Sequence, residues 1–117
     1  MSRLTTHVLD TARGRPAAGL RIEVYRLTVD SRDRVAEAVT NADGRCDAPL
    51  LSGHAFRPGV YEIVFHAGAW LAAEGFDLPR PRFLDDVPIR FGISEPEGHY
   101  HVPLLLSPYG YSTYRGS

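Results

Sequence analysis

Apolar side chains alternate with charged or aromatic ones throughout Leu20-Arg21-Ile22-Glu23-Val24-Tyr25. The same spacing of two recurs in segments 60–65 and 87–93. A spacing of two places successive side chains on opposite faces of a β-strand. The three segments therefore predict half-buried strands, and together they indicate a mainly β protein.

Weaker alternation and turn residues extend this pattern along the rest of the chain. Asn41-Ala42-Asp43-Gly44 is typical of a tight turn, because glycine takes a positive φ without a steric penalty, and we expect a β-hairpin to close there. About seven or eight short strands favour an all-β sandwich. The further strands are expected at 4–9, 35–40, 100–106 and 111–114.

The sequence predicts one short helix, over Ala67–Glu74, because this alanine-rich segment ends at Gly75. The proline-containing segment 76–83 is expected to form an extended loop. No internal repeat or low-complexity linker divides the 117 residues, so we expect a single domain over 1–117.

Charge and composition exclude several classes of function. The formal net charge is -1 at pH 7, so the chain lacks the broad positive field that holds nucleic acid or an anionic membrane. All 13 basic residues are arginine, which excludes a lysine nucleophile or Schiff base. We therefore expect no nucleic-acid partner and no membrane partner.

The single cysteine, Cys46, excludes an internal disulfide and suits a reducing compartment, so a cytoplasmic location is expected. The N-terminal segment does not resemble a secretion signal, and no window reaches the roughly 18 apolar residues that cross a bilayer. These features predict a soluble protein. Neither Arg45 nor Asp47 would activate the thiol between them, so Cys46 is interpreted as a small, partly buried residue.

Histidines gather in the segment His99-Tyr100-His101-Val102-Pro103-Leu104-Leu105-Leu106. On a strand, His99 and His101 share one face with apolar neighbours, which is unusual for a face that meets only water. His7 has the same setting in the strand expected at 4–9. Such faces suit contact with another subunit.

Imidazole takes up and releases a proton near neutral pH, so two histidines at one cavity suit hydrolysis. His7 and His101 are the candidate pair, although a lone strand histidine is more often structural and the sequence alone does not bring the two together. Zinc is the alternative, because His99 and His101 lie about 7 Å apart on one strand face and His7 offers a third nitrogen. No cysteine cluster or suitably spaced carboxylate accompanies them, and we predict no required metal.

Other reactive side chains have structural interpretations. Asp85 and Asp86 precede a strand, where turn capping and solvation are usual. Ser107 precedes a proline and lacks the glycine-flanked turn of a hydrolase nucleophile. His54 and His66 stand in turn and strand contexts and are taken as structural.

Three motifs lie near the start, in the middle and at the end of the chain, and the match that they carry covers essentially the whole chain. They are Leu4-Thr5-Thr6-His7-Val8-Leu9-Asp10, Asp43-Gly44-Arg45, and the ending His99-Tyr100-His101-Val102-Pro103-Leu104-Leu105-Leu106-Ser107-Pro108-Tyr109-Gly110-Tyr111-Ser112-Thr113-Tyr114-Arg115-Gly116-Ser117. Together they resemble the 5-hydroxyisourate hydrolase branch of the transthyretin family. The ending is the most specific of the three.

Transthyretin itself, the thyroid-hormone carrier of this family, is similar to the chain but differs at the positions that matter for chemistry. The carrier has lysine in place of His7, glutamate in place of Arg45 and threonine in place of His101. It also has a longer tail in place of residues 114–117. The resemblance therefore favours the hydrolase over the carrier.

The resemblance implies an all-β transthyretin-like sandwich of two four-stranded sheets with one short helix. It also implies a homotetramer whose active sites lie in a channel at the dimer-dimer interface, with the C-terminal Tyr114-Arg115-Gly116-Ser117 folded into them. Such an assembly would cover the outer strand faces that carry His7 and His101.

The resemblance further implies cofactor-free hydrolysis of the C6–N1 amide of 5-hydroxyisourate, yielding 2-oxo-4-hydroxy-4-carboxy-5-ureidoimidazoline in urate degradation towards allantoin. His101 is then expected to activate water as the base, with His7 polarising or protonating the substrate, although the sequence leaves open which histidine does which. Arg45 would bind the substrate ring and stabilise the oxyanion.

Four further residues take supporting parts under the same resemblance. Ser117 would orient His101 through its hydroxyl or the terminal carboxylate. Tyr114 would line the substrate pocket, and His99 and Ser112 would support the catalytic side chains from behind.

Overall fold

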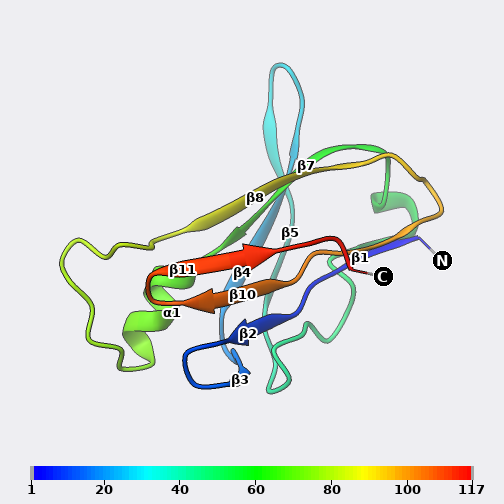
Figure 1. The fold of residues 1–117 in the computed structure, drawn as a ribbon. Helices are drawn as coiled ribbons and strands as arrows, with labels where there is room; N and C mark the ends of the chain where they lie inside the picture. Colours follow the sequence, from blue (N-terminus) through cyan, green and yellow to red (C-terminus); the bar gives the residue numbers. More distant parts are fainter. Residues whose placement is uncertain (1, 117) are drawn as a thin grey trace.

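The computed structural model describes residues 2–116, which form two β layers with a short helix at one end (Figure 1). Neighbouring strands in the first layer are antiparallel. In spatial order this layer contains β5 (Arg32–Val39), β4 (Arg21–Leu27), β7 (Gly59–Phe65) and β8 (Val87–Ile93).

The second layer is a four-stranded sheet whose strands are briefly interrupted. One half has the order β6 (Leu51–Ser52), β1 (Arg3–Thr5), β9 (His99–His101). The other has the order β11 (Gly110–Thr113), β10 (Leu104–Ser107), β2 (Val8–Asp10), β3 (Arg15–Pro16).

The two halves of the second layer keep a single register. Each residue of β1 and β2 lies opposite the residue 96 positions later, in β9 and β10 respectively. Backbone hydrogen bonds from Val102 to Thr5 and from Leu104 to His7 bridge the interruption. The predicted sandwich of two four-stranded sheets is therefore confirmed.

The alternation that predicted the strands also decides which side chains form the core. Leu20, Ile22 and Val24 are fully buried between the layers, as are Ile63 and Phe65 of β7. At about 25 cal/mol for each Å² of apolar surface, burial of such a set is the main stabilising contribution to the fold.

The strands predicted at 4–9 and 100–106 are each divided in two. The division falls where Pro103 has no backbone N–H to donate and where Thr6 turns its hydroxyl inward to the Val102 carbonyl, at 2.6 Å. Strands predicted at 35–40 and 111–114 form with ends shifted by one to three residues.

The turn at residues 41–44 forms, but the predicted hairpin is wrong. Gly44 has φ +74°, and a Cβ there would collide with the Val8 carbonyl oxygen, so only glycine fits. The Asn41 N–H donates to the Arg45 carbonyl at 2.7 Å. Arg45 then forms an isolated bridge with His7 instead of pairing with β5. The turn therefore crosses between layers and delivers Arg45 to the second sheet.

Helix α1 spans Ala67–Ala73, one residue shorter than predicted, and Gly75 follows it with φ +88°. Trp70 anchors it by donating an indole hydrogen bond to the Ala18 carbonyl at 2.7 Å. A single 3-10 turn, η1, spans Gly53–Ala55. Within residues 2–116, every helix is too short or too polar to be a membrane span.

Candidate functional site

Two histidines and a threonine meet on the outer face of the second layer. Thr5 on β1 lies directly opposite His101 on β9, and the parallel register places His99 opposite Arg3. The Thr5 hydroxyl oxygen lies 2.8 Å from Nδ1 of His101 and 2.9 Å from Nε2 of His99. Both imidazole rings are half-buried, with centroids 6.3 Å apart.

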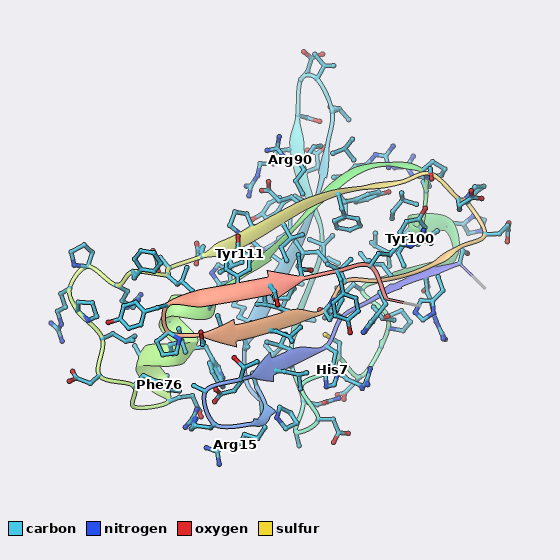
Figure 2. The ribbon with its side chains drawn as sticks, in the orientation of Figure 1. His7, Arg15, Phe76, Arg90, Tyr100 and Tyr111 are labelled. Carbon is cyan, nitrogen blue, oxygen red and sulfur yellow. The ribbon has the colours of Figure 1, made fainter. Side chains whose placement is uncertain are left out.

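His7 follows β1 on the same outer face and is labelled just before β2 in Figure 2. Its Nε2 lies 2.9 Å from the Asp43 carbonyl oxygen, so the crossing turn fixes the ring. Arg45, at the end of that turn, is exposed, and it takes part in none of the ion pairs that the described residues form.

The C-terminal segment continues from β11 along the outer edge of β9, as Figure 1 shows. The Gly116 N–H donates to the His101 carbonyl at 2.7 Å, and a Cβ on Gly116 would lie 2.7 Å from Cδ2 of His101. A side chain at residue 116 would therefore displace the His101 ring. Arg115 turns to the other side and stacks its guanidinium 4.1 Å from the centroid of the Tyr100 ring.

Two cavities meet at the histidine pair. One, of about 410 Å³, is lined by Thr5, Arg45, His99 and His101 together with Arg3 and residues 46–49. The other, of about 570 Å³, is lined by His99, His101 and residues 114–116. A larger cavity of about 640 Å³ beside the loop after α1 is lined by no histidine, and one of about 440 Å³ is lined by the single histidine His54. The two cavities on β9 each combine two histidines and are therefore the candidate site.

The surroundings of both β9 histidines favour the neutral imidazole. Burial lowers the pKa of His101 below its ordinary value of 6.5, and the positive charge of Arg45, with smaller effects of His99 and His7, lowers it further. Burial, and then the charge of Arg3, lowers the pKa of His99. At neutral pH His101 is therefore available to accept a proton.

The zinc alternative finds no support in the described part of the chain, where no three His, Cys, Asp or Glu side chains converge on a common point. Cys46 lines the first cavity, but burial, and then Asp47, raise the pKa of its thiol. The thiolate is thus disfavoured, in agreement with the structural interpretation of this cysteine.

Comparison with known proteins identifies the family. The profile of the HIUase/Transthyretin family matches residues 4–116. The chain belongs to this family. It is 62% identical, over 98% of its length and 96% of the relative's, to 5-hydroxyisourate hydrolase 2 of Rhizobium meliloti.

Two solved structures of the HIUase/transthyretin family share the fold. The 5-hydroxyisourate hydrolase of Klebsiella pneumoniae is 38% identical, with a TM-score of 0.83 and complete coverage of both chains. Sea bream transthyretin in complex with thyroxine is 31% identical, with a TM-score of 0.86 over 97% of this chain and 94% of that one. The family therefore contains a 5-hydroxyisourate hydrolase and a thyroxine-bound transthyretin on one fold, and the sequence identity is higher to the hydrolases.

The structure brings most of the predicted site residues together. His101, His99 and Arg45 line one cavity, Tyr114 lines the adjoining one, and the crossing turn fixes His7 beside Arg45.

Ser112 lies farther along β11, opposite Leu105, and lines neither cavity. Ser117 lies outside the described residues. The parts assigned to all these side chains stay predictions.

Sequence reasoning missed Thr5, which contacts both β9 histidines. The available signal was its position, because Thr5 and His7 are two residues apart and share the outer face of one strand. A threonine on a strand needs no explanation by itself, since β-branched residues favour strands. Its importance emerges only from the pairing of β1 with β9.

Proposed function

We propose that this chain hydrolyses the C6–N1 cyclic amide of 5-hydroxyisourate to 2-oxo-4-hydroxy-4-carboxy-5-ureidoimidazoline, without a cofactor. The observation that carries the proposal is that His101 is half-buried, has a lowered pKa and lines a cavity together with Arg45. The relative from Rhizobium meliloti, at 62% identity, is named for this activity.

In the proposed reaction His101 acts as the general base. Its Nδ1 faces Thr5, so Nε2 is the nitrogen left to accept a proton from water. The hydroxide attacks the C6 carbonyl, the tetrahedral oxyanion collapses, and the C6–N1 bond breaks. N1 leaves with a proton, and C6 becomes a carboxylate.

Arg45 and His7 act on the substrate side of the proposed reaction. The Arg45 guanidinium has no carboxylate partner among residues 2–116 and is free to bind the ring and stabilise the oxyanion. His7 polarises the substrate or supplies the proton to N1. Tyr114 forms the wall of the second cavity.

The active assembly in this proposal is a homotetramer with its sites at the dimer-dimer interface. Both cavities open on the outer face of the second layer, where His7 and His101 share a face with Leu9 and Leu105, and these leucines are only half-buried. Covering such a face with a second copy would remove apolar surface from water and close the cavities. The single-domain organisation and the cytoplasmic location stay predictions.

The direct test is the ultraviolet decay of freshly generated 5-hydroxyisourate with and without the protein. Acceleration proportional to protein concentration, retained in EDTA, supports the metal-free hydrolase. A loss of turnover in EDTA that zinc restores would contradict metal-free hydrolysis, and an unaltered decay rate would contradict the function itself.

Hormone transport is the second candidate, because thyroxine-bound sea bream transthyretin shares the fold at 31% identity. The polar lining of the histidine cavities disfavours an aromatic, iodinated ligand. Calorimetry should show weak thyroxine binding or none. Submicromolar affinity would instead support the carrier.

A further inference from the structure

The Thr5 hydroxyl holds one proton yet contacts two imidazole nitrogens. Its oxygen lies 2.8 Å from His101 Nδ1 and 2.9 Å from His99 Nε2, both within hydrogen-bond distance. A hydroxyl donates once and accepts through its lone pairs. If it donates to one histidine, the other must therefore donate to it, and the two rings cannot choose their tautomers independently.

Two arrangements satisfy both contacts when the histidines are neutral. In the first, Thr5 donates to His99 Nε2, and His101 donates from Nδ1, which leaves His101 Nε2 without a proton. In the second, Thr5 donates to His101 Nδ1, His99 donates from Nε2, and His101 carries its proton on Nε2. Only the first arrangement presents a basic nitrogen to the cavity.

We propose that Thr5 is a positioning residue that selects the base-competent tautomer of His101, with His99 as the acceptor that completes the arrangement. This inference rests on the proposed hydrolase function. Thr5 then acts on the reaction through His101, and His99 accepts the hydrogen bond from the Thr5 hydroxyl.

The charges around the pair favour neutral rings, which both arrangements require, over protonated ones. His101 faces Arg45 from the crossing turn, His7 from the segment before β2 and His99 from its own strand, and all three lower its pKa after the larger effect of burial. His99 faces Arg3 of β1. Asp47 lines the same cavity, but its carboxylate accepts a hydrogen bond from Asn41. Because the groups that shift the two pKa values are cations or potential cations, neither ring is favoured as an imidazolium at rest.

The outer-face position of Thr5 makes the inference testable without loss of the fold. Thr5 is half-buried on β1, and its inward neighbours Leu4 and Thr6 supply the core contacts there. Valine has the same branched shape and a similar strand preference but no hydroxyl. Thr5→Val therefore removes both hydrogen bonds, whereas Thr5→Ser keeps them.

The tautomers are measured by long-range ¹H–¹⁵N correlation spectra of the intact protein above the pH at which both rings are neutral. Wild type and Thr5→Ser are expected to show His101 with its proton on Nδ1, and Thr5→Val is expected to lose this preference. Thr11→Val, which removes a hydroxyl bonded to the Leu106 carbonyl at the far end of the sheet, is the matched control and should leave the spectra of both rings unaltered.

Steady-state kinetics on the same proteins supply the second readout. We expect Thr5→Val to lower kcat by about ten- to a hundredfold with little effect on KM, and Thr5→Ser to stay within about threefold. The Thr5 oxygen accepts more strongly from an imidazolium than from a neutral ring, so its loss should lower the midpoint of the acid limb by roughly half a pH unit.

The two readouts separate this inference from the proposed function. The spectra need no substrate, so an inactive wild type would contradict the hydrolase while the tautomer result stood. His101 carrying its proton on Nε2 in wild type, or unaltered tautomers in Thr5→Val, would overturn the inference. A kcat loss in Thr5→Val without a change of tautomer or midpoint would also overturn it. If Thr5→Val does not fold, Thr5→Ala carries the same expectations.

Discussion

The outer faces of the two layers both carry histidine and arginine. On the first layer these side chains form ion pairs with carboxylates, and on the second layer His7, Arg45, His99 and His101 form none within residues 2–116. On the first layer, Glu23 accepts hydrogen bonds from Arg34 at 3.0 Å and lies 2.7 Å from Nε2 of His66. Glu62 on the same layer is paired with two further arginines, at 3.3 and 3.2 Å. Both carboxylates are only 8% exposed. Every buried charge there has an opposite partner.

On the second layer, histidine and arginine gather without carboxylate partners among the described residues. None of the ion pairs formed within residues 2–116 involves His7, Arg45, His99 or His101. The pKa values of His99 and His101 are lowered, which disfavours the charged form of each ring. Arg34 and His66 lower the pKa of the Glu23 carboxyl to about 2, which favours its charged form.

The difference shows how to distinguish a structural histidine from a reactive one. His66 lies between two carboxylates, which orient it and occupy both ring nitrogens. His101 contacts a neutral hydroxyl through Nδ1, and its Nε2 has no hydrogen-bond partner among residues 2–116. A histidine whose two ring nitrogens pair with carboxylates therefore indicates a structural role. A partly buried histidine without a carboxylate partner at a cavity indicates a candidate functional residue.

The largest expected effect is a loss of activity on substitution of His101 or Arg45, on the outer face of the second layer. His101→Asn and Arg45→Glu should each lower kcat/KM by at least about a hundredfold, the scale of losing a general base or an oxyanion donor. The matched control is His66→Asn, which makes the same change on the paired face and should leave kcat/KM within about twofold while lowering Tm. Near-normal kinetics in both site variants would remove them from the mechanism.

The tail should have an effect of similar size. Removing residues 114–117 takes away the segment that packs on His101 through Gly116, and we expect kcat/KM to fall by about a hundredfold while the assembly persists. Kinetics with light scattering measure both quantities. An affinity tag after Ser117 should also impair activity, whereas the same tag before Met1 should be tolerated. A fully active tetramer without the four residues would refute this part of the site.

A smaller effect concerns the pH dependence of the unpaired face. Burial, Arg45 and the neighbouring histidines lower the pKa of His101 below its ordinary value of 6.5. The imidazole therefore stays neutral at pH 6.5 and becomes protonated only at lower pH. The acid limb of kcat/KM against pH should therefore have its midpoint below 6.5. Arg45→Gln removes one positive neighbour and should raise that midpoint. No movement of the midpoint would show that the limb reports another group.

The smallest expected effect concerns stability on the paired face. The carboxyl of Glu23 has a pKa of about 2 in the fold against 4.5 in the unfolded chain, so its contribution to stability is present above pH 4.5 and is lost as the pH falls towards 2. In Glu23→Gln, Tm should depend less on pH across this window, with kcat at neutral pH retained. Thermal melts at several pH values measure the slope. Parallel curves for the two proteins would contradict it.

Much of the fold was predictable because strand alternation is a local property. The pleat of a β-strand sends neighbouring side chains to opposite faces, so Ile22 and Val24 indicate the buried side of β4 without knowledge of any partner. Gly75 similarly indicates the end of α1, since the positive φ after a helix is local. The chemical character of His7 and His101 was also evident from residue type and shared faces.

Tertiary structure decided the contacts between segments far apart in the chain. Thr5 meets His101 only because β1 and β9 pair across 96 positions, and no local pattern encodes that register. The crossing turn carries Arg45 to His7, where the sequence predicted a hairpin. Sequence alone thus determined the strands and the kinds of reactive side chain. The pairing of strands, which depends on how two hydrophobic faces close over one core, decided which of those side chains are neutralised and which remain free to react.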